Sequence, residues 1–216
     1  MIRIVIADDH TIVRDGLKQL LGGERDFEVV GEAPDGHEVM EQVRNTDFDV
    51  LLLDVSMPGK SGMELIKQVK AERPKLRVLV LSMHQEHQYA VRAIKSGASG
   101  YLTKDSAPTQ IVAAVRKVAG GGAFISAEVA EQLALSSMPH SESPPHTTLS
   151  DREYQVFQLL VGGTSVSDIA GKLNLSVKTV STHKARVLEK LGIGNQTELV
   201  HYALKHRLTG DPNTAG

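Results

Sequence analysis

The first half of the chain alternates short apolar segments with amphipathic ones, and this alternation restricts the possible folds more than any other feature. Five segments have the length and Val, Ile and Leu content of β-strands: 2–8, 27–33, 50–54, 77–82 and 100–103. Five segments with helical spacing of apolar residues follow them in turn: 12–21, 36–45, 62–72, 86–96 and 108–119. This order predicts an α/β domain with a five-stranded parallel sheet, because parallel neighbours need crossover helices that cover both faces.

A change of composition divides the chain after the fifth helical segment. Glycines 120–122 end that helix, and a short helix is expected at 127–135. Residues 136–148 are rich in Pro, Ser and Thr, as linkers are, and only helical patterns follow them. We therefore expect a domain at 1–122, a linker with a short helix at 123–148, and a small all-α domain at 149–210.

Charge and composition narrow the function classes. Residues 1–146 hold 16 Lys and Arg against 20 Asp and Glu, whereas residues 147–216 hold 8 against 6, which indicates two different roles. The absence of cysteine excludes disulfides, thiolate catalysis and cysteine-bound zinc. No apolar run reaches the roughly 18 residues of a membrane span, and no signal peptide precedes the first strand. We expect a cytoplasmic protein that does not enter a membrane.

Polar side chains gather where four of the predicted strands end. Asp8 and Asp9 end the first strand, Asp54 the third and Ser82 the fourth, and Lys104 follows the fifth. Open parallel sheets bind ligands at the carboxyl ends of their strands. Three neighbouring carboxylates would be relieved of mutual repulsion by a hard dication such as Mg2+. An Asp beside Mg2+ can attack a phosphoryl group, while a lysine and a hydroxyl stabilise the transferring oxygens.

The motifs IADDH, LLLDVSMPGKSG, VLVLSMH and SGYLTKD resemble the receiver domain of bacterial response regulators, over about residues 1–120. This resemblance implies a doubly wound, flavodoxin-like fold. It also implies Asp54 as phosphoacceptor, Asp9 as direct Mg2+ ligand, Asp8 as a ligand mainly through water, and the Ser56 carbonyl as the remaining protein ligand. The same resemblance assigns switch and phosphoryl-binding positions to three residues: Ser82, Tyr101 and Lys104. Asp105 departs from the family, in which proline often follows the lysine.

Simpler roles remain open for each of these residues taken alone. Asp8 and Asp9 could cap a helix, and Asp54 could be a turn residue. Tyr101 could be ordinary packing, and His10 is expected to be a loop residue rather than a ligand. The phosphorylation hypothesis depends on the whole set, in the order in which it occurs.

The second domain contains two short amphipathic helices around the turn 174–176. Val166, Ile169, Ala170 and Leu173 form the apolar face of the first helix, and Val180, Val187, Leu188 and Leu191 that of the second. The other face of the second helix is small, polar and basic, which suits a DNA major groove, although a solvated surface would have the same pattern.

The segment from LSDREYQVFQLL to HKARVLEKLGI, within residues 149–208, resembles the LuxR/GerE-type four-helix DNA-binding domain. The resemblance implies that 177–191 is the recognition helix. Ser181, Thr182 and Ala185 would then face base edges, and Lys178, Thr179, Lys184 and Arg186 would favour phosphates. The last helix, 197–208, would be a dimer helix with candidate contacts at Leu199, Val200 and Ala203, with packing inside one copy as the equal alternative.

Together the two resemblances identify the chain as a member of the NarL/FixJ-type response regulators. The implied function is a transcription factor that a sensor histidine kinase phosphorylates and that binds double-stranded DNA as a homodimer, without being an enzyme. One rival is a phosphohydrolase of the haloacid-dehalogenase type, but Ser56 stands where that family needs a second Asp. Another is a constitutive DNA-binding protein with an idle receiver.

Overall fold

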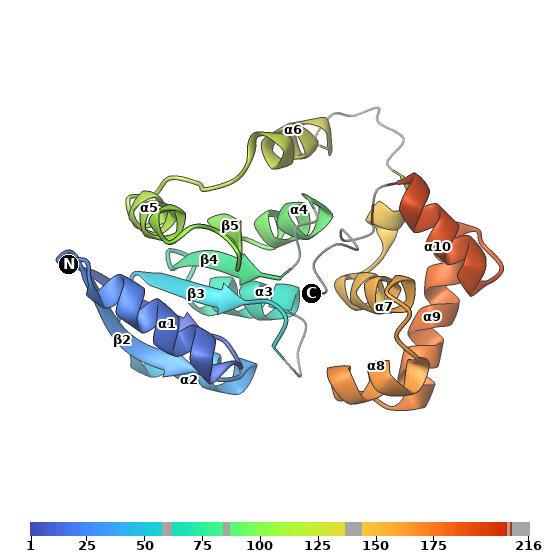
Figure 1. Ribbon diagram of the computed structural model, residues 1–216, viewed down its shortest axis with the longest axis horizontal. Coiled ribbons are helices and arrows are strands. Elements are labelled where there is room, and N and C mark those ends of the chain that lie inside the picture. Colours follow the sequence, from blue (N-terminus) through green and yellow to red (C-terminus); the bar gives the residue numbers. More distant parts are fainter. Residues whose placement is uncertain (58–61, 84–86, 137–143, 207, 209–216) are drawn as a thin grey trace. The chain divides into compact units, whose positions relative to one another are not determined.

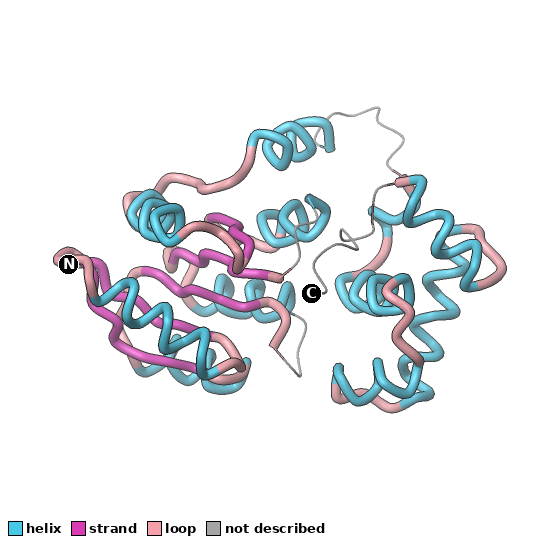
Figure 2. Tube along the Cα trace, in the orientation of Figure 1, coloured by secondary structure: helices cyan, strands magenta, loops and turns pink. Residues whose placement is uncertain are grey.

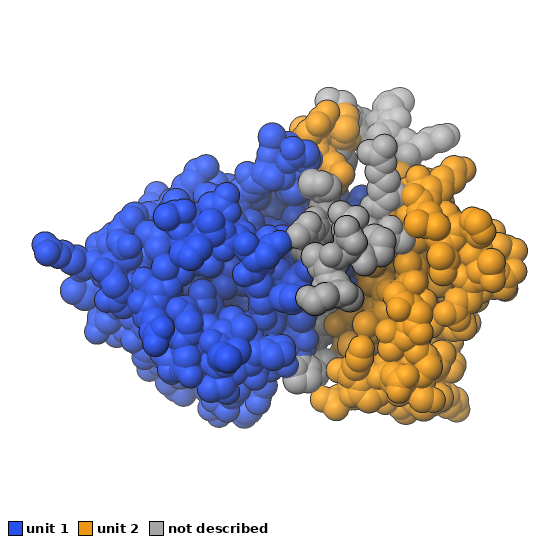
Figure 3. Space-filling view, viewed as in Figure 1, with its two compact units in different colours: residues 1–130 blue, residues 131–216 orange. Residues whose placement is uncertain are grey.

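The computed structural model describes residues 1–57, 62–83, 87–136, 144–206 and 208 (Figures 1 and 2). The chain divides into two compact units, residues 1–130 and 131–216 (Figure 3). Each unit is described by itself. Of the predicted linker, residues 137–143 lie outside the described residues, as do Pro58 and Gly59 after the third strand.

The first unit is built on a five-stranded parallel sheet in the order β2-β1-β3-β4-β5. Its strands are β1 (Ile2–Ala7), β2 (Phe27–Ala33), β3 (Val50–Asp54), β4 (Arg77–Ser82) and β5 (Gly100–Thr103). Helices α1 (Thr11–Gly22), α2 (Gly36–Asn45), α3 (Gly62–Glu72), α4 (His87–Lys95) and α5 (Pro108–Ala119) alternate with them. The α/β prediction is confirmed, with small changes at the ends of three elements: β1 ends at Ala7 rather than at Asp8, α1 spans 11–22 rather than 12–21, and α4 spans 87–95 rather than 86–96.

The core explains why the central strands are apolar throughout. All five residues of β3 are buried, since strands between two layers of helices have no solvent face. One core cluster joins alternate residues of the central strands, such as Leu52 and Leu79, to α1 and α5. The intervening residues, such as Leu51 and Leu53, are also fully buried and point to the opposite face. The sheet is thus a rigid platform that holds the residues at its carboxyl edge.

The second unit is helical, as predicted. Its elements are η1 (Pro145–Thr148), α7 (Asp151–Val161), α8 (Val166–Leu173), α9 (Val177–Leu191) and α10 (Gln196–Lys205), after α6 (Ala127–Ser136), which spans the boundary between the units. Serine side chains cap three of these helices: Ser150 for α7, Ser165 for α8 and Ser176 for α9. The turn between α8 and α9 depends on Asn174, whose φ of 51° is left-handed.

Two segments at the ends of this unit differ from the prediction. The last helix spans 196–205 rather than 197–208, because the Leu208 N–H donates to the Ala203 carbonyl and turns the chain back. Gln158 donates to the Leu208 carbonyl and holds that turn on α7. At the other end, η1 lies where linker was expected, and its His146 is 3% exposed and contacts Tyr202. The end of the linker therefore packs as part of the helical unit.

Candidate functional site

An acidic site lies at the carboxyl edge of the sheet. β1 and β3 are neighbours, so Asp8, Asp9 and Asp54 emerge side by side. β4 and β5 pair next to them, and the Lys104 N–H donates to the Ser82 carbonyl at 2.8 Å. Parallel strands deliver their ends to one edge, which is why residues so far apart in sequence meet here.

Lys104 joins the two buried carboxylates. Its Nζ lies 2.7 Å from Oδ2 of Asp54 and 2.5 Å from Oδ2 of Asp8, and its side chain is 9% exposed. Asp54 and Asp8 are each 1% exposed. The Ser56 N–H donates to Oδ1 of Asp54 at 2.7 Å, so Asp54 also makes the local turn that was its simpler alternative role.

Burial and neighbouring charges shift the pKa values of the site residues in opposite directions. Burial raises the pKa of Asp54, and the opposing effects of the Lys104 and Ser56 hydrogen bonds do not fully offset it. Burial alone would lower the pKa of Lys104, but the hydrogen bonds and charges of Asp54 and Asp8 raise it. The lysine is therefore held as a cation beside a carboxylate that is poorly solvated.

The residues present fit a hard dication. Ligand atoms of Asp8, Asp9, His10 and Asp54 lie within 4.8 Å of one another. Both oxygens of the buried Asp8 carboxylate are engaged: Oδ2 contacts the Lys104 ammonium, and Oδ1 accepts from the His10 N–H. Carboxylate oxygens are the ligands that Mg2+ prefers, and one ammonium does not balance the charge of three carboxylates, so a dication would suit this cluster. The capping alternative does not apply to Asp8 and Asp9, because His10 is the N-cap of α1 and its side chain makes no cap hydrogen bond.

His10 is the member of this cluster that sequence reasoning assigned to a loop. Its Nδ1 lies 2.8 Å from Oδ1 of Asp9 and 3.2 Å from Oδ1 of Asp8. The available signal was only its position directly after two acidic residues. Because a side chain at a loop can point either way, that signal could not place the ring.

The predicted switch residues lie in the adjoining strands. Ser82 is fully buried at the end of β4, while Tyr101 is 9% exposed in β5, where its N–H donates to the Phe124 carbonyl. Tyr101 is therefore packed inward here, as its simpler alternative role requires. Ser56 is exposed, directly beside the buried Asp54.

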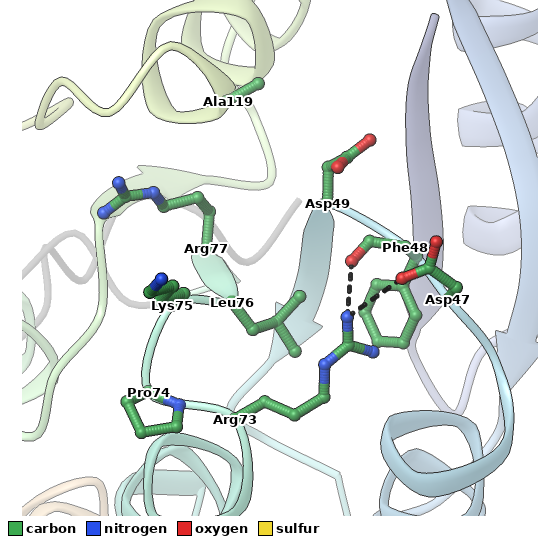
Figure 4. A pocket seen from close by; sticks show the side chains of 9 residues that line it. All are labelled: Asp47, Phe48, Asp49, Arg73, Pro74, Lys75, Leu76, Arg77 and Ala119. Carbon is green, nitrogen blue, oxygen red and sulfur yellow. Dashed lines mark hydrogen bonds and ion pairs between the residues drawn. The ribbon is translucent and has the colours of Figure 1, made fainter.

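A hollow of about 590 Å3 lies at the other edge of the sheet, where β3 and β4 begin (Figure 4). Arg73 reaches across it to the Phe48 carbonyl and to the Asp47 carboxylate, at 3.1 and 3.4 Å. It contains none of the predicted site residues. The acidic edge, not this hollow, carries the groups capable of phosphoryl chemistry.

In the second unit, α9 has the predicted bounds and the predicted polar face. Five of the seven candidate DNA contacts are exposed and two are half-buried; together they are Lys178, Thr179, Ser181, Thr182, Lys184, Ala185 and Arg186. Lys184 donates to Oε1 of Gln196 at 3.2 Å, so α10 holds its ammonium in place. The Thr182 hydroxyl donates to the Lys178 carbonyl, which leaves its methyl group and oxygen lone pair for other contacts.

The candidate dimer contacts on α10 are largely internal. Leu199 and Ala203 are both 0% exposed within one copy of the chain, so for them the structure favours the alternative of core packing. Val200 is half-buried. The exposed apolar residue of this helix is Leu204, at 57%. Helical spacing alone could not decide which of these faces the core.

Comparison with known families decides the identity. The family model described as the response regulator receiver domain matches residues 4–116, and the one described as bacterial regulatory proteins of the luxR family matches residues 147–203. The chain belongs to the NarL/FixJ family of response regulators. It is thus a two-component response regulator with a LuxR-type DNA-binding domain that regulates transcription.

Relatives of this response regulator match over almost the whole chain. Response regulator UvrY of Escherichia coli K12 is 36% identical over 209 residues, which cover 96% of each chain. Response regulator GacA of Pseudomonas viridiflava is 38% identical over 95% of this chain and 97% of the relative. A structure of RcsB from Salmonella typhimurium is 32% identical and covers 94% of this chain and 97% of that one, with a TM-score of 0.69.

Another RcsB structure, from Salmonella enterica serovar Typhimurium, is described as bound to promoter rprA in the presence of the phosphomimetic BeF3−. It is 31% identical, covers 94% of this chain and 98% of that one, and has a TM-score of 0.66. Within the part of this response regulator that the structure describes, no helix is both long and apolar enough to cross a membrane.

Proposed function

We propose that a sensor histidine kinase phosphorylates this response regulator on Asp54, and that phosphorylation controls how α9 binds DNA. The observation that carries the proposal is the buried Asp54 carboxylate, held 2.7 Å from the Lys104 ammonium among two further carboxylates. A carboxylate needed only for stability has little reason to occupy such a repulsive position, because a buried ion pair is a weak source of stability.

The chemical step requires an ionised Asp54. One of its carboxylate oxygens attacks the phosphorus atom of the kinase phosphohistidine, the P–N bond breaks, and the imidazole leaves with the bonding electron pair and takes up a proton. Ser56 donates its N–H to Oδ1 and orients the carboxylate. Lys104 neutralises charge that develops on the phosphoryl oxygens.

Mg2+ is the metal that the acidic cluster would hold in this proposal. Asp9 and Asp54 would be direct ligands, with Asp8 acting mainly through water and the Ser56 carbonyl completing the protein ligands. When bound, the metal supplies positive charge that offsets the repulsion between the carboxylates and the incoming phosphoryl group.

The oxygens of the new phosphoryl group can also accept hydrogen bonds that the free Asp54 carboxylate does not accept. Lys104 would shift from the Asp8 and Asp54 oxygens to a phosphoryl oxygen, and the Ser82 hydroxyl would donate to another. Because the Lys104 N–H donates to the Ser82 carbonyl, these two changes involve two bonded neighbouring segments, the end of β4 and the loop after β5. Tyr101 lies in the strand that leads into that loop, so repacking of its ring is the route by which charge at Asp54 changes the surface.

On DNA, α9 would lie in the major groove of one half-site. Ser181, Thr182 and Ala185 would read base edges, and the cationic residues would contact phosphates. A structure of RcsB is described as two dimers bound to two parallel DNAs, and one of 32% identity as an RcsB–DNA complex. We propose that this chain likewise binds as a homodimer, with half-sites about 34 Å apart, roughly 10 bp.

In this role the protein is a phosphoacceptor in the cytoplasm rather than an enzyme that turns over substrate. The phosphohydrolase alternative is disfavoured by Ser56, which cannot serve as a general acid or base. The alternative of an idle receiver predicts that DNA affinity is the same with and without phosphorylation.

A labelling experiment tests the phosphorylation site. Radiolabelled acetyl phosphate with Mg2+ should label the wild-type chain and should not label Asp54→Asn. Asp49→Asn is the matched control, because Asp49 precedes the same strand but lies at its other end and is exposed. Undiminished labelling of Asp54→Asn would place the phosphoryl group elsewhere.

A further inference from the structure

The first residue of α9 is an exposed valine that lies outside the predicted set of DNA contacts. Val177 is 51% exposed, whereas Val180 and Val187 on the inner side of the same helix are 0% exposed. Val177 lies four residues before Ser181 and eight before Ala185, so the three share one face of the helix. That face is the one predicted to meet base edges. The valine therefore begins the row of side chains that would read DNA.

The hydroxyl groups next to Val177 are used within the helix. Ser176 is the N-cap, and its Oγ accepts from the Thr179 N–H at 3.0 Å and lies 2.7 Å from the Thr179 hydroxyl oxygen. Apart from these hydroxyls, the exposed side chains at the start of α9 are the apolar Val177 and the cationic Lys178. The first turn thus presents one apolar and one positively charged group, whose contacts with DNA must differ in kind.

The position and the chemistry of Val177 together limit what it can recognise. In helix-turn-helix proteins the N-terminal residues of the recognition helix contact base edges in the major groove. A valine side chain neither donates nor accepts a hydrogen bond, and the apolar group that a base pair presents in the major groove is the C5-methyl group of thymine. Because its branched Cβ leaves valine few rotamers, little side-chain entropy is lost when its methyl groups are held against a base.

We propose that Val177 determines sequence specificity by packing against the C5-methyl group of a thymine in each half-site. The inference rests on the proposed function, since it requires α9 in the major groove. Lys178 attracts the phosphates of any sequence and so supplies affinity. Val177 instead favours one orientation of an A·T pair, the one that places the thymine methyl group against its side chain. Its contribution is discrimination between sequences at one base position.

The test removes the methyl group from the DNA as well as from the protein. A high-affinity sequence is selected from random DNA with the full chain, treated with acetyl phosphate and Mg2+. Each thymine of one half-site is then replaced in turn by uracil, which forms the same base pair but lacks the methyl group. Affinities at fixed salt are measured for the wild type, Val177→Ala and two controls. Lys178→Ala changes the neighbouring cation, and Leu204→Ala shortens an apolar side chain on α10 that is 57% exposed.

At one thymine, uracil should weaken wild-type binding about fourfold, the factor expected for one buried methyl group. Val177→Ala should bind the thymine and uracil forms of that site nearly equally, whereas Lys178→Ala and Leu204→Ala should keep the wild-type difference. A selected half-site without such a thymine, or an equal loss in the wild type and Val177→Ala, would overturn the inference.

Lys178→Ala also separates this inference from the proposed function. Weaker binding of Lys178→Ala to all sequences supports α9 as the helix that contacts DNA, whatever the result for Val177. Unchanged binding of Lys178→Ala counts against that placement of α9 itself.

Discussion

The Lys104 ammonium lies 2.7 Å from Oδ2 of Asp54, although fifty residues separate the two in sequence. Both side chains are nearly excluded from water. A second carboxylate, that of Asp8, contacts the same ammonium. The folded state therefore concentrates negative charge at one edge of the sheet, and a single lysine pairs with the two buried carboxylates there.

Lys104→Met should destabilise the first unit by roughly 3 kcal/mol, because it leaves two buried carboxylates without their cation. Urea-induced unfolding in the absence of divalent metal measures this loss, and added Mg2+ should restore part of it by mass action. Lys95→Met is the control, since Lys95 is exposed at the end of α4. A loss as small as that of the control would mean that the lysine is not the principal counter-ion.

Asp54→Asn should make the metal-free protein more stable at neutral pH. The pKa of Asp54 is raised by burial, so its ionised form is disfavoured in the folded state, and wild-type stability falls as pH rises above the ordinary value of 3.8. Asparagine does not ionise and avoids this cost. The difference between the two proteins should therefore narrow as pH is lowered towards 3.8, in unfolding curves recorded without divalent metal. A difference that is independent of pH would contradict the assigned cause.

The fold was largely predictable because its signals are local. The bounds of β2 to β5 follow from where apolar runs begin and end, and α9 begins after a capping serine, Ser176. The end of α10 was not predictable, since Leu208 turns back to meet Gln158, which lies fifty residues earlier. Periodicity also could not separate core from dimer contact at Leu199, because both roles require an apolar residue at the same spacing.

The membership of the site was predictable in part. Strand ends indicated Asp8, Asp54 and Lys104, because parallel strands finish at one edge and the family resemblance named the same residues. The contact of Lys104 with both carboxylates depends on the paths of three loops, and sequence spacing does not determine it. The position of the His10 ring likewise does not follow from sequence spacing. Such contacts are set by tertiary packing rather than by local pattern.

Lys190→Met should destabilise the second unit by about 1–2 kcal/mol. Lys190 Nζ lies 2.6 Å from Oε2 of Glu153, whose side chain is 4% exposed, and removing the cation leaves that carboxylate poorly compensated. The figure is below that of a fully buried pair because Lys190 is 38% exposed. Lys172→Met, an exposed lysine on α8, should have little effect in the same chemical unfolding experiment.

The Lys190–Glu153 pair should also make the free energy of unfolding of the second unit depend on pH, in a direction that the Glu153 pKa determines. Burial acts to raise the pKa of Glu153, but the bonds from Lys190 and Ser150 prevail and lower it below 4.5. The stabilisation is therefore present above pH 4.5 and is lost as pH falls through the lowered pKa. The loss of unfolding free energy caused by Lys190→Met should accordingly be largest at neutral pH and become smaller in acid.

Lys178→Ala should weaken DNA binding about equally for all sequences and reduce the slope of log affinity against log salt by about 1, because a phosphate contact releases one counter-ion. Thr182→Ala should instead change which sequences are preferred, by roughly 1–3 kcal/mol at one base position. Binding titrations at several salt concentrations and selection from random DNA measure the two effects. Lys172→Ala controls for a cation on the neighbouring helix α8. If Lys178→Ala and Lys172→Ala changed the salt slope equally, α9 would not be the helix that contacts DNA.

The central claim is that phosphorylation of Asp54 controls DNA binding, and the most direct measurement is DNA affinity with and without acetyl phosphate, in Mg2+ and at fixed salt. Wild-type protein, on a sequence selected from random DNA, should bind at least about tenfold more tightly when phosphorylated, a difference of about 1.4 kcal/mol. Asp54→Asn should bind with the same affinity in both conditions. Equal affinity of the wild type in both conditions, with labelling of Asp54 verified, would contradict the account and leave an idle receiver attached to a constitutive DNA-binding domain.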